Sequence, residues 1–342
     1  MTWAEDPALV RLGWDSGRAV QWRSAGSQGR PGRVSRLDRG WSTVLVDAEA
    51  PPLRIRNIGA DVAVGDWVVA SPDGERVESV LERRSALVRR ASFEGARAEP
   101  HTLAANIDTV FLLHALTSPI NPRRLERELV LAFDSGAAPA VVLTKADAAV
   151  ETEQAVAETV AVALGVPVYV VSSRARHGLD AIRAHANGNR TLALLGASGV
   201  GKSTLVNALV GTEVQRTGDV RDDQRGRHTT VAAELIELPS GGWLVDTPGL
   251  RAVSLWSSGH GIERAFTDVF DLADHCRFRD CKHEAEPGCA VQAAIDAGAL
   301  DPVRLESMAR LVAEEATIED EQRERERAGD RRGARRPRPR TP

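Results

Sequence analysis

The central stretch of the sequence is Thr191-Leu-Ala-Leu-Leu-Gly196-Ala-Ser-Gly-Val-Gly-Lys202-Ser203, an apolar run that leads directly into a glycine-rich turn. The turn fits the pattern G-x-x-x-x-G-K-[ST], and the residues after it predict a helix through about Val210 that Gly211 ends. Glycines let backbone N–H groups wrap phosphate oxygens, and a helix N-terminus adds positive potential. In this pattern Lys202 reaches the β- and γ-phosphates and the Ser203 hydroxyl ligates Mg²⁺. The alternative is a chance glycine-rich turn between a strand and a helix. The expected phosphate contacts are Gly196, Ala197, Ser198, Gly199, Val200, Gly201, Lys202, Ser203 and Thr204.

Apolar runs alternate with helical stretches on both sides of this turn, from about residue 105 to residue 261. The runs are Val110–Leu113, Ala140–Leu143, Val168–Val171 and Thr191–Leu195. Such alternation is typical of an α/β domain with a mostly parallel sheet. Each of the last three runs leads into a polar motif, which is where open α/β sheets bind their ligands.

Two of these polar motifs predict a guanine site. Thr144-Lys145-Ala-Asp147 follows one strand, and Ser172-Ser173-Arg174 follows the next. The Asp147 carboxylate can accept from the N1–H and exocyclic amine of guanine, whereas adenine presents the opposite donor pattern. Lys145 is also one of only three lysines among 44 basic residues. An ordinary polar loop remains the alternative for this motif alone.

A third motif completes the pattern of a GTPase core. Asp246-Thr-Pro-Gly249 follows the second strand of an expected hairpin whose first strand is Ala233–Leu238. We expect Asp246 to hold Mg²⁺ through water and the Gly249 N–H to sense a γ-phosphate. Just upstream, Thr229 or Thr230 offers a hydroxyl that completes the Mg²⁺ shell. Asp246 by itself would be read as part of an ordinary turn.

The order of these motifs is unusual. The guanine motifs at 144–147 and 172–174 precede the phosphate loop at 196–203, whereas ordinary GTPases have them after it. A circular permutation preserves the site, because every motif still leaves the same strand end, but it moves the chain termini. The domain is therefore predicted to be a circularly permuted GTPase.

The cysteines predict a metal site. All three of them, Cys276, Cys281 and Cys289, lie within fourteen residues, together with His283. Three thiolates and one imidazole make a closed tetrahedral set for a structural zinc ion. Free buried thiols are the alternative, and His275 is a competing imidazole.

Short strand-like runs from Arg33 to about Arg90, split by turn residues, predict a small all-β barrel. Six arginines and one acid between Arg18 and Arg39 give the entry to this region a charge of +5. The OB-fold is one barrel that binds nucleic acid with such a face, and a solvated strand edge is the alternative.

These motifs together resemble a known family over roughly residues 30–315. The phosphate loop, Gly226-Arg-His-Thr-Thr230, Asp246-Thr-Pro-Gly249 with a hydrophobic residue after it, and Cys276-Arg-Phe-Arg-Asp-Cys-Lys-His-Glu-Ala-Glu-Pro-Gly-Cys-Ala290 resemble the bacterial small ribosomal subunit biogenesis GTPases of the RsgA (YjeQ) family. The resemblance implies an OB-fold, a permuted GTPase using GTP and magnesium, and a zinc domain. It further implies docking of a monomer on the 30S subunit and its 16S rRNA late in assembly, with hydrolysis of GTP to GDP stimulated by that particle and coupled to release.

The sequence departs from common GTPase patterns at two positions. Thr144 stands where the guanine motif usually has Asn, so a hydroxyl replaces an amide. Leu250 stands where many GTPases have the Gln that orients water, and the family that the sequence resembles also has a hydrophobic residue there. The resemblance implies that His228 assists hydrolysis, together with Lys202 and Thr230. A structural or RNA-facing role for His228 is the alternative.

Composition limits the remaining classes. No apolar run approaches the ~18 residues of a membrane span, and the N-terminus carries acids where a secretory signal carries bases, so we expect a cytoplasmic protein with no membrane partner. The formal net charge is −4, yet the last twelve residues hold six arginines and no acid. That basic tail predicts either a solvated end or a contact with nucleic acid.

We therefore expect a multidomain protein with an all-β OB-fold barrel, a central α/β circularly permuted P-loop GTPase domain and a C-terminal helical zinc-binding domain. The expected limits are an extension at 1–30, the barrel at 31–95, the GTPase at 100–262, the zinc domain at 263–316 and a disordered, arginine-rich tail at 317–342. The rival function is an RNA-binding assembly scaffold in which GTP is a slow timer. The two differ in whether 30S subunits strongly raise hydrolysis.

Overall fold

A computed structural model of the chain describes residues 6–26, 29–89, 101–211, 233–246 and 260–333. The chain divides into two compact units, Met1–Ser254 and Leu255–Pro342. Within the described residues, none of the helices combines the length and the apolar character that crossing a bilayer requires.

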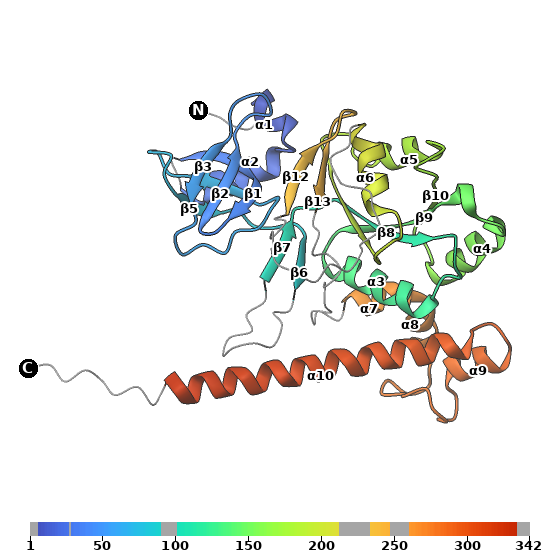
Figure 1. Cartoon of the computed structure of the whole chain (residues 1–342). Coiled ribbons are helices and arrows are strands. Elements are labelled where there is room, and N and C mark those ends of the chain that lie inside the picture. Colours follow the sequence, from blue (N-terminus) through green and yellow to red (C-terminus); the bar gives the residue numbers. More distant parts are fainter. Residues whose placement is uncertain (1–5, 27–28, 90–100, 212–232, 247–259, 334–342) are drawn as a thin grey trace, which may run out of the picture. The chain divides into compact units, whose positions relative to one another are not determined.

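Five strands of the first unit form a small barrel (Figure 1). They are β1 (Arg30–Asp38), β2 (Trp41–Leu45), β3 (Leu53–Arg56), β4 (Trp67–Ala70) and β5 (Val77–Val80). β1 pairs with both β2 and β4, β2 pairs with β3, and β4 pairs with β5. A parallel bridge between Arg56 and Arg76 joins the two ends of this series. Val34, Val44 and Ile55 point inward and are fully buried, so the alternation of the strands produces the apolar core that the sequence predicts.

Two short helices precede the barrel, where the sequence predicts only an extension at 1–30. They are α1 (Pro7–Arg11) and α2 (Ser16–Ser24). The carboxylates of Asp6 and Asp15 cap them by accepting from backbone N–H groups. Leu9 is fully buried, and the Trp14 ring meets Trp67 of β4 edge-on at 4.9 Å between centroids. Helices of five and nine residues are too short for a reliable apolar period, so the sequence pattern misses them.

A six-stranded α/β sheet follows, in the order β10-β9-β8-β11-β13-β12. The first five of these strands are parallel, and β12 runs antiparallel to β13 as the expected hairpin. Helices cover both faces (Figure 1). The strands are β8 (Thr109–Ala115), β9 (Ala138–Thr144), β10 (Val168–Val170), β11 (Thr191–Gly196), β12 (Glu234–Glu237) and β13 (Trp243–Asp246). The helices are α3 (Pro122–Asp134), α4 (Thr152–Val162), α5 (Leu179–Ala184) and α6 (Lys202–Val210). A separate ribbon of β6 (Ala86–Arg89) and β7 (His101–Ala105) links the barrel to this sheet along the chain.

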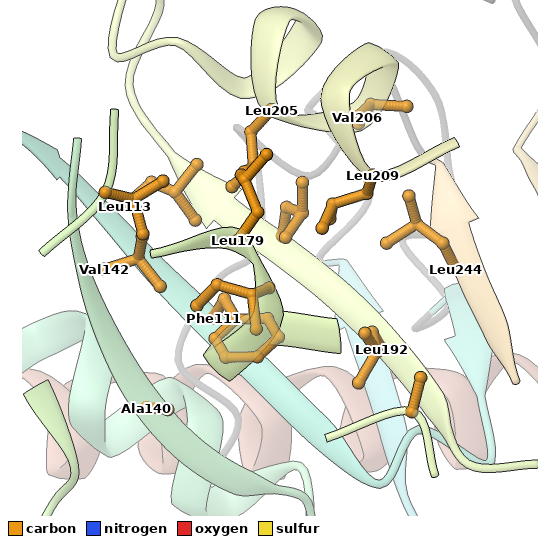
Figure 2. Packing of buried hydrophobic residues seen from close by; sticks show 14 of the residues in the cluster. Phe111, Leu113, Ala140, Val142, Leu179, Leu192, Leu205, Val206, Leu209 and Leu244 are labelled. Carbon is orange, nitrogen blue, oxygen red and sulfur yellow. The ribbon is translucent and has the colours of Figure 1, made fainter. Parts of the chain in front are cut away.

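The core of this domain fixes the strand and the helix that flank the glycine-rich turn. Figure 2 shows Phe111 and Leu192 of the sheet packed with Leu179 of α5 and with Leu205 and Leu209 of α6. All five are at most 2% exposed. Burial of a side chain of this size is worth about 1.5–3 kcal/mol, so the turn is anchored at both ends.

The barrel and the α/β sheet are continuous, because β1 also pairs with β12 through Arg36 and Glu234. Arg33 of β1 is 2% exposed, and its guanidinium donates to the Leu12 carbonyl at 2.6 Å and to the Thr191 hydroxyl at 2.5 Å. Burial lowers the pKa of Arg33 to about 10. Arg18 is equally buried. Neither arginine therefore belongs to an exposed basic face, which corrects the expectation for the run from Arg18 to Arg39.

The second unit is helical around the cysteine segment. Its helices are α7 (His260–Ala265), α8 (Thr267–Ala273), α9 (Ala290–Asp296) and α10 (Pro302–Gly333). Buried Arg304 of α10 donates to Asp268 at 2.9 Å and to the Ala265 carbonyl at 2.6 Å, and it stacks over the Phe266 ring at 4.4 Å. α10 crosses the expected limit at residue 316 and continues to Gly333, and the last nine residues lie outside the described part of the chain.

Candidate functional site

The phosphate-loop pattern lies between β11 and α6, as the sequence predicts. Gly196, Gly199 and Gly201 have φ of +155°, +77° and +100°. A Cβ at Gly196 would lie 2.8 Å from the Leu113 carbonyl oxygen, so the loop requires a residue without a side chain there. The loop therefore turns tightly and leads directly into the N-terminus of α6, where backbone N–H groups and the helix dipole favour an anion.

Lys202 lies across this loop. Its ammonium donates to the carbonyl oxygens of Gly196 at 2.5 Å and Ala197 at 2.7 Å. Ser203 follows it in the first turn of α6 and is half-buried. Ser198 and Gly199 at the tip of the loop are exposed. The Lys202 ammonium and the Ser203 hydroxyl are thus both next to the loop that the sequence predicts to bind phosphate and magnesium.

The guanine motif follows β9. Lys145 adopts φ of +59°, and a short 3-10 turn, Ala146–Ala148, presents the exposed Asp147. Ser172, which follows β10, donates its hydroxyl to an Asp147 carboxylate oxygen at 2.6 Å. This hydrogen bond lowers the pKa of Asp147. The Ser172 hydroxyl therefore stabilises the ionised form of the carboxylate, which is the form that can accept from guanine.

The structure brings the guanine motif and the phosphate loop to one cavity of about 290 Å³. The cavity is lined by Thr117, Thr144, Lys145, Asp147, Ala148, Ser173, Arg174, Gly201 and Thr204. The two motifs meet because β8 separates β9 from β11 in a parallel sheet, so all three strands end at the same edge. Thr117 is not predicted from the sequence. It lies two residues after the end of β8, and the rule that polar residues after parallel strands face the ligand could have found it.

The remaining predicted residues divide into two groups. Asp246 ends β13, the strand beside β11, and is half-buried, so its carboxylate is near the strand end that bears the phosphate loop. His228, Thr229, Thr230 and Gly249 lie outside the described residues.

The second unit contains the predicted metal ligands as one cluster. The ligand atoms of Cys276, Cys281, His283 and Cys289 all lie within 4.8 Å of one another. The Cys276 sulfur lies 3.9 Å from that of Cys289 and 3.6 Å from His283 Nδ1, and the Cys289 sulfur lies 3.4 Å from the same nitrogen. Ligand atoms around a tetrahedral Zn²⁺ are about 3.5–3.8 Å apart, given the usual bond lengths, so these residues fit a metal ion.

Neighbouring groups hold the cluster in shape. Glu286 accepts from the backbone N–H groups of Lys282 at 2.7 Å and Glu284 at 2.9 Å, and such backbone bonds lower its pKa to about 2. Gln292 donates to the His283 carbonyl. The competing imidazole, His275, lies within 2.9 Å of the Asp271 carbonyl through its Nδ1 and is not part of the cluster.

A third feature lies on the outer face of the barrel. The guanidinium groups of Arg54 and Arg56 lie 5.4 Å and 5.0 Å from the centroid of the Trp41 ring. Both arginines are exposed, and in the strand registers Thr43 pairs with Arg54 and with Arg36. We name Arg36, Trp41, Arg54 and Arg56 the arginine–tryptophan face. It holds three guanidinium groups and one aromatic ring, and Asp38 lies 3.8 Å from the Arg36 guanidinium. Cationic and aromatic groups together are the properties that bind single-stranded nucleic acid.

Comparison with known proteins identifies the family of this chain. A family model described as RsgA GTPase matches residues 80–256. The small ribosomal subunit biogenesis GTPase RsgA of Streptomyces coelicolor is 43% identical over 329 residues, 91% of this chain and 87% of that protein. The protein of the same name from Xanthomonas euvesicatoria is 44% identical over 331 residues, 91% of this chain and 89% of that protein.

Solved structures agree on the fold. The crystal structure of YjeQ from Thermotoga maritima has a TM-score of 0.63 at 25% identity and covers 84% of this chain and 98% of that chain. YloQ, described as a circularly permuted GTPase, has a TM-score of 0.62 at 24% identity and covers 85% of this chain and 96% of that chain. With its guanine motif placed before its phosphate loop and both at one sheet edge, this chain is a GTP-hydrolysing enzyme that belongs to the RsgA GTPase family.

Proposed function

We propose that this GTPase binds the 30S ribosomal subunit and its 16S rRNA late in assembly, that the subunit stimulates hydrolysis, and that hydrolysis to GDP is coupled to release. The observation that most supports the GTP-dependent part of this proposal is the cavity that Asp147 and Gly201 of the phosphate loop both line. The named function of the relatives, small ribosomal subunit biogenesis, supports the choice of particle. In this proposal the protein acts as a monomer in the cytoplasm.

The proposed roles in the nucleotide site follow the sequence motifs. Lys202 binds the β- and γ-phosphates, and Asp147 with Lys145 selects guanine. Ser203 and Asp246 would hold Mg²⁺, and the ion would neutralise charge on the phosphates. The other proposed positions are Thr229 or Thr230 for the Mg²⁺ shell, Gly249 for the γ-phosphate and His228 for assisting hydrolysis.

The Cys₃His cluster is proposed to hold one structural zinc ion. Four protein ligands leave no open position for a substrate, so the ion would stabilise the second unit rather than catalyse. The barrel limits 31–95 are proposed with it, whereas α7 (His260–Ala265) spans the expected limit between the GTPase at 100–262 and the zinc domain at 263–316, and α10 extends beyond 316.

The barrel, in this proposal an OB-fold, contacts rRNA through the arginine–tryptophan face. Guanidinium groups neutralise phosphates, and the Trp41 ring offers a surface on which a base can stack. We expect Arg54→Ala together with Trp41→Ala to weaken binding to 30S subunits about tenfold or more, with a smaller salt dependence of the binding constant. Arg123→Ala, at an exposed arginine on α3, is the control for loss of charge elsewhere.

The deciding experiment measures GTP hydrolysis by the purified protein alone, with 30S subunits and with 50S subunits. We expect a large increase with 30S subunits and little with 50S subunits. Binding to 30S subunits without any increase in hydrolysis would favour the scaffold in which GTP is a slow timer. If the wild-type protein did not select GTP over ATP, the assignment of the nucleotide site itself would be contradicted.

A further inference from the structure

Thr144, at the end of β9, contacts the phosphate loop. Its side chain is buried, with 2% of the residue exposed. The hydroxyl oxygen lies 2.5 Å from the carbonyl oxygen of Val200, inside the phosphate loop, and 3.3 Å from the carbonyl oxygen of His114 on β8. The hydroxyl therefore joins the ends of β8 and β9 to the phosphate loop that follows β11.

The number of protons on this hydroxyl limits what it can bind. Both neighbouring oxygens are acceptors, and a hydroxyl has a single proton to donate. The short distance assigns that proton to Val200. Guanine N7 is also an acceptor and needs a donated proton. The one proton of the Thr144 hydroxyl is already bonded to the Val200 carbonyl oxygen. An amide at this position would have two donors and could satisfy the loop carbonyl and N7 together.

We propose that Thr144 is a positioning residue that fixes the phosphate loop and makes no hydrogen bond to guanine N7, so that base selection rests on Asp147. This inference rests on the proposed nucleotide site. It assigns Thr144 to the phosphate loop rather than to the base, and it explains how a threonine serves in the guanine motif.

The experiment compares the dissociation constants of GTP, 7-deaza-GTP and ATP, because 7-deaza-GTP differs from GTP by lacking the N7 acceptor. We expect the wild-type protein to bind GTP and 7-deaza-GTP within about twofold and to bind ATP far more weakly. Thr144→Asn should gain the contact and favour GTP over 7-deaza-GTP by about three- to tenfold.

Two further variants test the positioning role. Thr144→Val keeps the shape but removes the donor to Val200, and we expect it to weaken GTP and 7-deaza-GTP equally, by about five- to a hundredfold. Thr144→Ser keeps the hydroxyl and should stay within about threefold of wild type. The matched control is Thr159→Val, because Thr159 is 1% exposed and donates to the Ala155 carbonyl at 2.6 Å within α4.

The outcomes distinguish failure of the inference about Thr144 from failure of the proposed guanine site. A wild-type protein that selects GTP over ATP but binds 7-deaza-GTP more than about fivefold more weakly would overturn the inference alone. Unchanged nucleotide affinity in Thr144→Val would also overturn it. Equal affinity for GTP and ATP in the wild type would overturn the proposed guanine site, and the inference with it.

Discussion

Asp147 shows how one neighbour decides what a side chain can do. It is exposed, and an exposed carboxylate would ordinarily titrate as a free acid. The Ser172 hydroxyl, 2.6 Å away, lowers its pKa and orients it beside the nucleotide cavity. The structure therefore gives the Ser172 side chain a role in holding Asp147.

Asp147→Asn should change the base preference. The carboxylate accepts from guanine N1–H and the exocyclic amine, whereas an amide can donate to the C2 oxygen of xanthine. A hydrogen bond to a charged group is worth about 1.5–3 kcal/mol, so we expect a tenfold to hundredfold shift in relative affinity from GTP toward XTP, in order of magnitude. Competition binding of GTP, XTP and ATP to both proteins measures it. An unchanged GTP to XTP ratio would show that residues 144–147 are an ordinary loop.

Ser172→Ala should change the pH dependence of the same selection. The pKa of Asp147 is lowered in the folded protein, so the carboxylate is lost only as pH falls through a value below its ordinary one. Without the Ser172 hydroxyl, that loss should occur at higher pH. Titration of the Asp147 carboxyl carbon by NMR in both proteins checks the direction, and identical titration curves would contradict it.

Lys202→Ala should abolish tight GTP binding or turnover, because it removes the cation that the structure places across the phosphate loop. Filter binding and phosphate release measure the two quantities. Full 30S-stimulated turnover in this variant would disprove the assigned role of Lys202.

At the scale of elements, the segment between α8 and α9 has the ligands for a metal but little regular structure of its own. Cys289 caps α9 by accepting from the Gln292 N–H at 3.4 Å, and Glu286 closes the preceding turn. Binding of a structural metal is coupled to folding, because the ligands come together only in the folded chain. The shape of this segment is therefore expected to depend on the ion.

Cys281→Ser should lose stoichiometric zinc and destabilise the second unit, because it removes one of four ligands. His275→Ala is the matched control, since His275 lies outside the cluster and should leave the zinc content at one. Metal analysis of the two purified variants and the wild type decides the matter. A wild-type protein without zinc would reject the assignment.

At the scale of the whole first unit, buried Arg33 links three regions that are distant in the sequence. From β1 of the barrel it reaches Leu12 after α1 and Thr191 at the start of β11, the strand that ends in the phosphate loop. The pairing of β1 with β12 makes the same connection through the backbone. The barrel and the nucleotide strand are thus parts of one packed body.

Arg33→Met should therefore destabilise the unit by about 2–4 kcal/mol, because the Leu12 carbonyl and the Thr191 hydroxyl each lose a buried charged partner. Arg36→Met is the matched control on the same strand. Its side chain is 51% exposed, so the expected change is within about 0.5 kcal/mol. Urea unfolding of both variants compares them, and equal midpoints would contradict the role of Arg33.

Local patterns determined the parts of this protein that are contiguous in the sequence. The strand, glycine turn and helix from Thr191 to Val210 are adjacent along the chain. The three cysteines with His283 span only fourteen residues. The chemistry of both segments can therefore be predicted without knowledge of the fold. The order of the GTPase motifs is likewise a property of the sequence, and the sheet order confirms the permutation. Periodicity is enough for such elements because each forms from near neighbours.

Contacts between distant segments were decided only by the tertiary structure. Residues 144 and 200 are far apart in the sequence, and the hydroxyl bond between them exists because β8 holds β9 and β11 on either side of it. Arg18 and Arg33 count as surface charge in any local reading, yet packing of α1, α2 and the sheet around them removes them from water. The sequence gives the charge and polarity of each residue directly. Its burial depends instead on which segments pack against it, and the packing of the whole chain determines those segments.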